Sequence, residues 1–310
     1  MSKLRISIVE YLNTAPLVWG FTHGAQRGKY DLSFTVPSQC AEALRTGAAD
    51  IAIIPAIEYQ RIEGLVVLPG MAIASRERVR SLLIIAKTPM ERARRVALDK
   101  SSRSTQALTR ILCADRWKIA PEFVDAAPDA TEMLRGADAA MLIGDPALRL
   151  AIALDGAGAK RAASGGWICS GERVGIAGVE TIYVYDVVEE WRRLTGLPAV
   201  LAIWATRKNA LTAEMTRDFA ESRDYGLARI AEICGEAAGE LSLPAAALET
   251  YLRENIDFSL STENCKGLEF YFARAAELGL IAEAKPIRWA CEQSQKVEGS
   301  EALTSGKQRV

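Results

Sequence analysis

The chain has 310 residues, which is enough for a sizeable hydrophobic core and, at roughly 100–200 residues per domain, for two domains. Its 38 Lys and Arg residues nearly balance its 39 Asp and Glu residues, and the formal net charge of −1 creates no global field that would attract nucleic acid or an acidic membrane surface. Hydrophobic residues make up 49% and charged residues 25% of the chain, as in globular proteins. We therefore expect a folded protein whose partner is a small molecule.

The start of the chain and its cysteines indicate the cellular compartment. Residues 4–9 already show a strand pattern, without the apolar stretch of a secretory signal, and no segment has 18 uninterrupted apolar residues. The six cysteines include no Cys-x-x-Cys pair, and His23 is the only histidine, so no zinc site is predicted. We expect a cytoplasmic protein with free thiols and no metal.

Short apolar strands alternate with helical patterns through the first two thirds of the chain. The predicted strands are 4–9, 32–36, 51–57, 81–87, 94–99, 139–144 and 200–207. The predicted helices are 39–47, 105–114 and one that opens at Asp145 and ends near Gly156. Strands separated by helices indicate βαβ units with parallel strands, so the predicted fold class is α/β.

After Arg207 the apolar residues recur at helical spacing as far as Leu280, which predicts a series of helices. We expect these helices to pack on the first of two lobes. The strands 81–87 and 200–207 are interpreted as crossing between two lobes. The predicted architecture is a two-lobed clamshell with two crossing hinge strands. Residues 1–84 and 203–290 form its first lobe, 88–198 form its second lobe, and the polar residues 291–310 form a disordered tail.

The sequence lacks the common nucleotide and hydrolase motifs. It has no Gly-x-Gly-x-x-Gly after a strand, no phosphate-binding loop with a Gly-Lys-Ser/Thr ending and no Gly-x-Ser-x-Gly elbow. We therefore predict no cofactor. Because ligands of α/β sheets bind beyond the carboxyl ends of the strands and often between domains, the cleft is the place to look for a site.

Two candidate groups come from the ends of predicted strands. Tyr11 and Asn13 follow the first strand, where the Asn13 amide can donate and accept hydrogen bonds, although Asn13 can equally cap the next helix. Ser81 is an isolated serine that opens the strand 81–87 and faces the hinge. Both serve a polar ligand in this interpretation.

Helix starts supply the next candidates. Ser38 is the expected N-cap of the helix after the second strand, and it serves either that helix or an anionic ligand. The predicted helix 105–114 is preceded by Ser102, Arg103 and Ser104 and begins at Thr105. Free N–H groups, hydroxyls and a guanidinium at this helix start can form hydrogen bonds to a carboxylate. The alternative is a serine-rich loop with an ordinary N-cap.

Gly144 is the last residue of the predicted strand 139–144, and Asp145 follows it. A glycine there lets the backbone approach a ligand closely. The stronger interpretation of Asp145 is that it caps the helix that follows, with Pro146 at the first helical position.

Several of these segments together resemble one known family. Six segments resemble, in order, those of the chorismate dehydratase family of the futalosine route to menaquinone. They are YLNTAPL, LRTGAADIAIIPAIEYQR, ASRERVRSLLI, ALDKSSRSTQALTRIL, AAMLIGDPAL and EEWRRLTGLPAVLAIWATR. The resemblance runs from about residue 4 to residue 280. It departs at Leu201, where an aromatic residue is expected.

The resemblance implies a fold like that of type II periplasmic binding proteins and a lyase activity. Chorismate would lose its ring hydroxyl and the hydrogen on the neighbouring carbon, giving 3-[(1-carboxyvinyl)oxy]benzoate. It also implies that Asn13 and Ser81 are the important polar residues of the active site. A carboxylate of the substrate is a plausible base, and a side chain of the protein is the alternative proton acceptor. On this hypothesis Ser38 and the helix start at Ser102–Thr105 hold the carboxylates of the substrate.

Two other functions compete with this one. A dihydroxynaphthoate synthase of the same pathway shares the fold and would need a histidine, for which His23 is the only candidate. A non-catalytic protein that closes on an organic anion is the alternative from another class. The sequence gives no indication of the oligomeric state.

Overall fold

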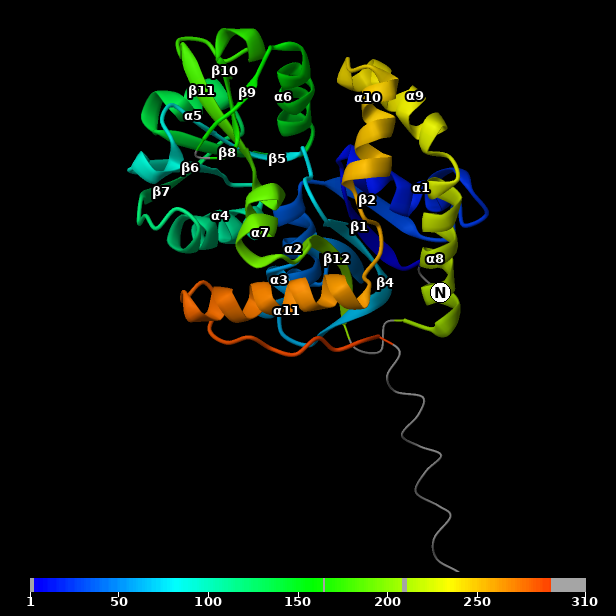
Figure 1. Ribbon diagram of the computed structural model, residues 1–310. Coiled ribbons are helices and arrows are strands. Elements are labelled where there is room, and N and C mark those ends of the chain that lie inside the picture. Colours follow the sequence, from blue (N-terminus) through cyan, green and yellow to red (C-terminus); the bar gives the residue numbers. More distant parts are fainter. Residues whose placement is uncertain (1–2, 164, 208–210, 291–310) are drawn as a thin grey trace, which may run out of the picture.

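The computed structural model describes residues 3–163, 165–207 and 211–290, and it folds them around two separate sheets (Figure 1). The five-stranded sheet has the order β2-β1-β3-β12-β4 and the seven-stranded sheet the order β7-β6-β8-β5-β11-β10-β9. The strands of the first sheet are β1 (Arg5–Val9), β2 (Asp31–Thr35), β3 (Ile51–Pro55), β4 (Leu65–Ser75) and β12 (Ala199–Arg207). Those of the second sheet are β5 (Leu82–Ala86), β6 (Arg95–Asp99), β7 (Glu122–Ala126), β8 (Ala139–Ile143), β9 (Lys160–Arg161), β10 (Trp167–Ser170) and β11 (Thr181–Asp186).

Helices surround both sheets. Those that precede β5 or follow β12 in the chain are α1 (Ala15–His23), α2 (Pro37–Thr46), α3 (Glu58–Arg61), α8 (Ala213–Leu227), α9 (Ile230–Leu241), α10 (Ala245–Thr250) and α11 (Thr262–Glu277). Those between β5 and β12 are α4 (Arg103–Asp115), α5 (Ala130–Gly136), α6 (Gly144–Gly156) and α7 (Val187–Thr195). Short turns of other helix types are η1 (Leu12–Thr14), η2 (Met90–Arg92), η3 (Glu172–Val174) and the π-helical turn η4 (Tyr251–Asn255). Among the described residues, none of these helices combines the length and apolar character needed to span a membrane.

Both sheets are mixed, which corrects the prediction of parallel sheets. Strands β1, β2 and β3 run parallel, as do β6, β7 and β8, because helical crossovers join them. In contrast, β12 pairs antiparallel with β3 and β4, and β5 pairs antiparallel with β8 and β11. Strands β5 and β12 are the first strands after the crossings between the sheets, and in the second sheet β10 is also antiparallel to β9 and β11.

The central strand β5 shows why the chain folds this way. Its five residues are all buried, and they alternate between two hydrophobic clusters: Leu82 and Ile84 point to one face of the sheet, and Leu83 and Ile85 to the other. A strand that is apolar at every position suits the middle of a sheet covered on both faces. The larger cluster continues through the interface into the first sheet, where it includes Ile6 and Trp204.

The chain passes twice between the two sheets, once from β4 to β5 and once from β11 through α7 to β12. The strands 81–87 and 200–207, which were predicted to cross, are each the first strand after a crossing, and each pairs within one sheet. The buried carboxylate of Asp186 joins both connections. It accepts N–H groups of Val79 (3.0 Å) and Arg80 (2.6 Å) from the first and of Val188 (3.0 Å) and Glu189 (3.1 Å) from the second.

The predicted lobe boundaries remain a prediction, but the sheets give their frame. The first sheet takes strands from 5–75 and 199–207, and the second takes strands from 82–186. As expected, the helices after Arg207 pack back on the first lobe: α8 contacts α1 and β4, and α11 contacts β12. Five cysteines, Cys40, Cys113, Cys169, Cys234 and Cys265, are free thiols as predicted. Cys291 and the predicted tail 291–310 lie outside the described residues.

Candidate active site

The two residues expected to carry catalysis meet at one buried hydroxyl group. The Tyr251 hydroxyl donates a hydrogen bond to Ser81 Oγ at 2.8 Å, and Asn13 also hydrogen-bonds with Tyr251. Ser81 is 1% exposed at the start of β5, whereas Asn13 is half-buried in η1. The structure therefore brings Asn13 and Ser81 together although 68 positions separate them in the sequence.

Asn13 does not cap the helix that follows it. The N-cap of α1 is Thr14, which makes no side-chain capping hydrogen bond. Instead, the Thr14 hydroxyl donates to Asn13 Oδ1 at 3.4 Å. The Asn13 amide therefore remains available to Tyr251 and to the cleft.

Tyr11 and Gly144 form a close contact between the lobes. Gly144 has a φ of 66°, and a Cβ atom at this position would lie 2.7 Å from the Tyr11 ring. Burial raises the pKa of the Tyr11 hydroxyl, while a hydrogen bond with Ser101 opposes that rise. The Gly144 N–H donates to the Ser81 carbonyl at 2.8 Å, so this glycine also holds the start of β5.

Asp145 lies in the same contact but not as the predicted helix cap. Helix α6 begins at Gly144 with Ile143 as its N-cap, and no side chain caps it. The Asp145 carboxylate reaches across to the first lobe and accepts the Leu12 N–H at 3.3 Å. Burial raises the pKa of this carboxyl from 3.8 to about 6, against the opposing influence of the Leu12 N–H and Arg149.

Ser38 is likewise not an N-cap. The N-cap of α2 is Val36, Pro37 is the first helical residue, and Ser38 is the second. A proline at this position is favourable because the first N–H of a helix has no partner within the helix. The Ser38 N–H donates to the Ser101 carbonyl at 3.1 Å and forms a further contact between the lobes.

The predicted anion site at the start of α4 is used in part by the protein itself. Ser102 is the N-cap, accepting the Thr105 N–H at 3.4 Å and donating its hydroxyl to Thr105 Oγ1 at 2.8 Å. The Arg103 guanidinium contacts Glu58 Oε2 at 2.8 Å, and the Ser104 hydroxyl accepts the Ile57 N–H at 3.1 Å. The side chains of Arg103 and Ser104 therefore attach α4 to the first lobe and do not join the group around Ser81.

A cavity of about 300 Å³ reaches Tyr11 and Asp145 from one side. Its walls include apolar residues of α1 and α9, and besides Asp145 three further carboxylates line it, those of Glu10, Glu236 and Glu240. Neither Asn13 nor Ser81 lines this cavity. Carboxylates repel a dianion, so this side of the contact is poorly suited to a dicarboxylate.

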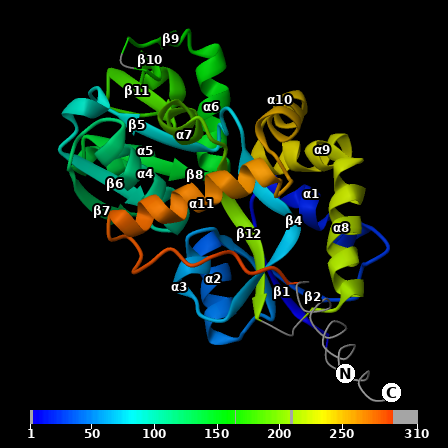
Figure 2. The ribbon, with the colours of Figure 1, turned by 60° about the horizontal axis from the view of Figure 1, so that its bottom comes forward.

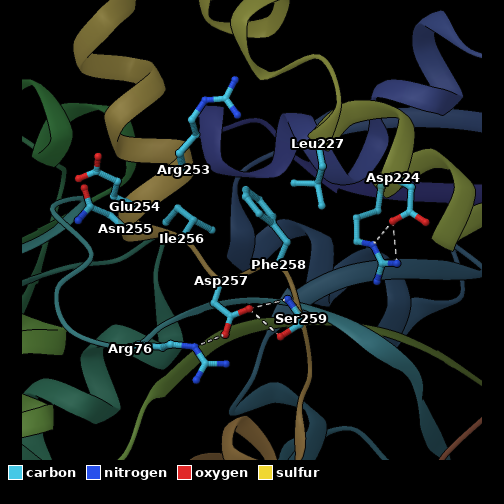
Figure 3. Close-up of a pocket in the computed structure, with 11 residues that line it drawn as sticks. Arg76, Asp224, Leu227, Arg253, Glu254, Asn255, Ile256, Asp257, Phe258 and Ser259 are labelled. Carbon is cyan, nitrogen blue, oxygen red and sulfur yellow. Dashed lines mark hydrogen bonds and ion pairs between the residues drawn. The ribbon is translucent and has the colours of Figure 1, made fainter.

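A larger cavity, of about 540 Å³, lies beside the residues that follow Tyr251 (Figure 3). Arg76, Arg223 and Arg253 contribute to its lining, but each has an acidic partner, which for Arg253 is Glu249 at 3.6 Å. Arg76 contacts Asp257 at 2.9 Å, and Arg223 contacts Asp224 at 2.8 Å. Their positive charge is therefore largely neutralised within the protein, and none of the predicted site residues lines this cavity.

Tyr251 is the functional candidate that the sequence analysis missed. It lies among apolar residues at helical spacing, between Leu248 and Leu252, and that pattern indicates a core position. The position is indeed buried, at 1% exposed. The only available signal was chemical, because a buried tyrosine hydroxyl requires a hydrogen-bond partner.

Comparisons with known proteins identify the family and the fold of the chain. Over 279 residues the chain is 26% identical to the chorismate dehydratase of Thermus thermophilus, covering 89% of this chain and 95% of that protein. Its fold is similar to that of a protein from Archaeoglobus fulgidus, with a TM-score of 0.67, 17% identity and coverage of 90% of this chain and 98% of that one.

The fold is also similar to that of the periplasmic aliphatic sulphonate binding protein of Escherichia coli, with a TM-score of 0.55, 16% identity and coverage of 97% and 98% of the two chains. These likenesses confirm the predicted two-lobed fold of periplasmic binding proteins. The family model described as menaquinone biosynthesis matches residues 4–277. Since that match covers most of the chain, the protein belongs to the menaquinone biosynthesis family.

Proposed function

We propose that the protein is a lyase that converts chorismate into 3-[(1-carboxyvinyl)oxy]benzoate and water. The observation that carries this proposal is the meeting of Asn13 and Ser81 at Tyr251, within a chain similar to a chorismate dehydratase over most of its length. We also propose that it acts in the cytoplasm on this small dicarboxylate alone, without cofactor, nucleic acid or membrane.

The reaction removes the ring hydroxyl of chorismate and the hydrogen on the adjacent carbon that bears the enolpyruvyl ether. The product ring is aromatic, so the substrate itself supplies the driving force. In this mechanism a carboxylate of the substrate takes the proton from the ring carbon and passes it to the departing hydroxyl, which leaves as water. The protein then has to hold the substrate in a reactive conformation and stabilise the departing oxygen.

Ser81 and Asn13 have the chemistry for the second task. Ser81 has a hydroxyl proton and Asn13 has amide protons, and both groups are neutral donors held at the lobe interface. Their hydrogen bonds to the departing hydroxyl would strengthen as charge develops on that oxygen. Main-chain N–H groups near Ser102 and the half-buried Ser38 hydroxyl are the proposed contacts for the carboxylates of the substrate.

The test is incubation of the purified protein with chorismate, followed by chromatography and mass spectrometry of the product. We expect turnover without added metal or nucleotide. Replacing either donor, as Asn13→Ala or Ser81→Ala, should lower kcat by about 10²–10³-fold, as for loss of a donor to a developing oxyanion. Ser33→Ala is the control, since Ser33 Oγ only donates to the Ile6 carbonyl at 3.3 Å in the first sheet.

Other outcomes would identify other functions. Tight binding of chorismate without product would indicate an organic-anion binding protein, and near wild-type turnover by both alanine variants would contradict the assigned roles. The dihydroxynaphthoate synthase alternative is not favoured. His23, the histidine it would need, stacks on Trp19 with ring centroids 3.7 Å apart and lines the acidic cavity.

A further inference from the structure

The Tyr251 hydroxyl joins two residues of the proposed active site from a third segment of the chain. Tyr251 opens the π-helical turn η4, which follows α10, and 170 positions separate it from Ser81. π-Helical turns are uncommon and are found mostly at functional sites. The hydroxyl nevertheless has no part in the mechanism described above, although it contacts both residues that the mechanism uses.

The segment that carries Tyr251 is anchored to the strand that leads to Ser81. Asp257 exchanges two main-chain hydrogen bonds with Ala74 of β4, at 2.8 and 2.9 Å. Its carboxylate also contacts Arg76 at 2.9 Å, and Figure 3 shows this contact beside Ser259. Because β4 and the residues after it lead directly to Ser81, Tyr251 and Ser81 are held by one connected framework.

The direction of the hydrogen bonds around Tyr251 follows from the number of protons available. A tyrosine hydroxyl has one proton, and Tyr251 donates it to Ser81 Oγ. Because that single proton is given to Ser81, the Asn13 amide nitrogen has to be the donor in the hydrogen bond with the Tyr251 oxygen.

The consequence concerns the Ser81 proton. Since Ser81 Oγ accepts a hydrogen bond from the Tyr251 hydroxyl, the O–H of Ser81 is free to point away from Tyr251. Burial raises the pKa of Tyr251 well above its ordinary value, so the phenol stays protonated and remains the donor at neutral pH. Hydrogen bonds in such a chain polarise one another, which makes the last donor stronger.

We propose that Tyr251 is a positioning residue for the dehydration: it holds Ser81 so that the Ser81 hydroxyl donates to the departing hydroxyl of the substrate. The inference rests on the proposed function and adds to it a chain of donors from Asn13 through Tyr251 to Ser81. No proton is lost from the chain in this role. The oxygen atom of the water that forms comes from the substrate hydroxyl.

The test is the removal of one oxygen atom, as Tyr251→Phe, together with Ser81→Ala and the double variant. Tyr251→Phe should lower kcat by roughly 10- to 100-fold, the range found when support of a directly acting group is lost, with KM for chorismate changed less than about threefold. In the Ser81→Ala background the same change should have no further effect, because the group through which Tyr251 acts is already absent.

Tyr59→Phe is the matched control. Tyr59 is 4% exposed, and its hydroxyl donates to the Pro286 carbonyl at 2.9 Å and accepts the Arg288 N–H at 2.8 Å. Both variants remove a buried phenolic oxygen with two hydrogen bonds, so both should lower the melting temperature. Only Tyr251→Phe should lower kcat.

Three results would overturn the inference. Unchanged kcat in Tyr251→Phe would remove the role of the hydroxyl, and an equal loss in the wild-type and Ser81→Ala backgrounds would show that Tyr251 does not act through Ser81. A wild-type protein without turnover would overturn the proposed function itself and this inference with it. If Tyr251→Phe does not fold, site-specific 3-fluorotyrosine at position 251, a more acidic donor of nearly the same shape, should raise kcat, and an unchanged kcat would contradict the proposal.

Discussion

At the scale of single residues, the candidate site depends on a few polar groups that are buried or half-buried with partners from the other lobe. Asp145 is the clearest case, since its carboxylate lies against the Leu12 N–H and its pKa is raised by burial. Removing a carboxylate from water disfavours the charged form, and one N–H partner with a nearby Arg149 does not fully compensate. The protein therefore keeps this carboxylate at a cost in stability at neutral pH.

We expect Asp145→Asn to stabilise the protein at neutral pH. With a pKa raised from 3.8 to about 6, the protonated carboxyl contributes stability that is fully present below pH 3.8 and is lost as the pH rises through 6. The shift corresponds to about 3 kcal/mol. Asparagine keeps an oxygen for the Leu12 N–H, so the gain of the variant over the wild type should be small at pH 4 and approach that value at pH 7.5.

Urea unfolding at several pH values measures this difference. Asp50→Asn provides a control with the opposite sign, since the Arg5 guanidinium holds the pKa of Asp50 below its ordinary value. The stability contributed by that pair is present above pH 3.8 and is lost as the pH falls, so Asp50→Asn should destabilise at pH 7.5 and have little effect in acid. Parallel stability curves for the wild type and Asp145→Asn would contradict the prediction.

At the scale of elements, one carboxylate connects three helices. Glu58 of α3 is 0% exposed and contacts Arg45 of α2 at 2.5 Å, Arg61 at 3.0 Å and Arg103 of α4 at 2.8 Å. Burial alone would raise the pKa of Glu58, but the three guanidinium groups together hold it below its ordinary value. This contact explains why the Arg103 side chain turns toward the first lobe.

Glu58→Gln should therefore destabilise the protein by about 3–5 kcal/mol at neutral pH, as when one partner of a buried ion pair is removed. The lowered pKa means that this contribution is present above pH 4.5 and is lost as the pH falls through the folded-state pKa. Urea unfolding at pH 7 provides the measurement, and an effect below about 1 kcal/mol would contradict the prediction.

Glu132→Gln is the control for this prediction. Glu132 also forms an ion pair, with Arg135 at 2.6 Å, but its side chain is 58% exposed. Exposed pairs contribute little because water and salt screen them, so this variant should lie within about 1 kcal/mol of the wild type.

At the scale of the whole molecule, the lobes contact each other at the site while Asp186 joins the two connections between them. The Tyr11 ring lies against Gly144, and the Ser38 N–H bonds to the Ser101 carbonyl. Figures 1 and 2 show the elements of the second sheet, such as β8 and α6, beside those of the first. On the proposed function, we expect the lobes to separate to admit the substrate at this place and then to close.

Gly144→Ala should hinder closure. The new Cβ would lie 2.7 Å from the Tyr11 ring, and alanine is strained at a φ of 66°. Gly47→Ala separates these effects, because Gly47 has a φ of 76° and open space around it. Both variants should lose about 1 kcal/mol of stability through the backbone, but only Gly144→Ala should raise KM for chorismate, by roughly tenfold or more.

Small-angle scattering provides the structural readout. The wild type and Gly47→Ala should become more compact with saturating product, and Gly144→Ala should not. An equal decrease in the radius of gyration for all three proteins would show that the contact between Tyr11 and Gly144 does not control closure.

Local patterns predicted many of the elements well and several of the side-chain roles poorly. The predicted strand 94–99 corresponds to β6 and the predicted helix 105–114 to α4. Ser102 is the N-cap of that helix, as the alternative interpretation of this segment predicted. The same rules were wrong for Ser38 and Asp145, which lie inside the first turn of their helices. A capping signal is short, and the contacts with Ser101 and Leu12 that occupy these residues come from the other lobe.

The sequence by itself determined the α/β class, the two-lobed fold, the alternation of buried strands with amphipathic helices and the family resemblance, because periodicity and motif order are properties of neighbouring residues. Only the tertiary structure decided that Arg103 forms an ion pair with Glu58 and that Tyr251 forms hydrogen bonds with Ser81 and Asn13. Those partners are 45 to 238 positions apart in the sequence. Their meeting depends on how two mixed sheets and the returning C-terminal helices pack, and no local pattern contains that information.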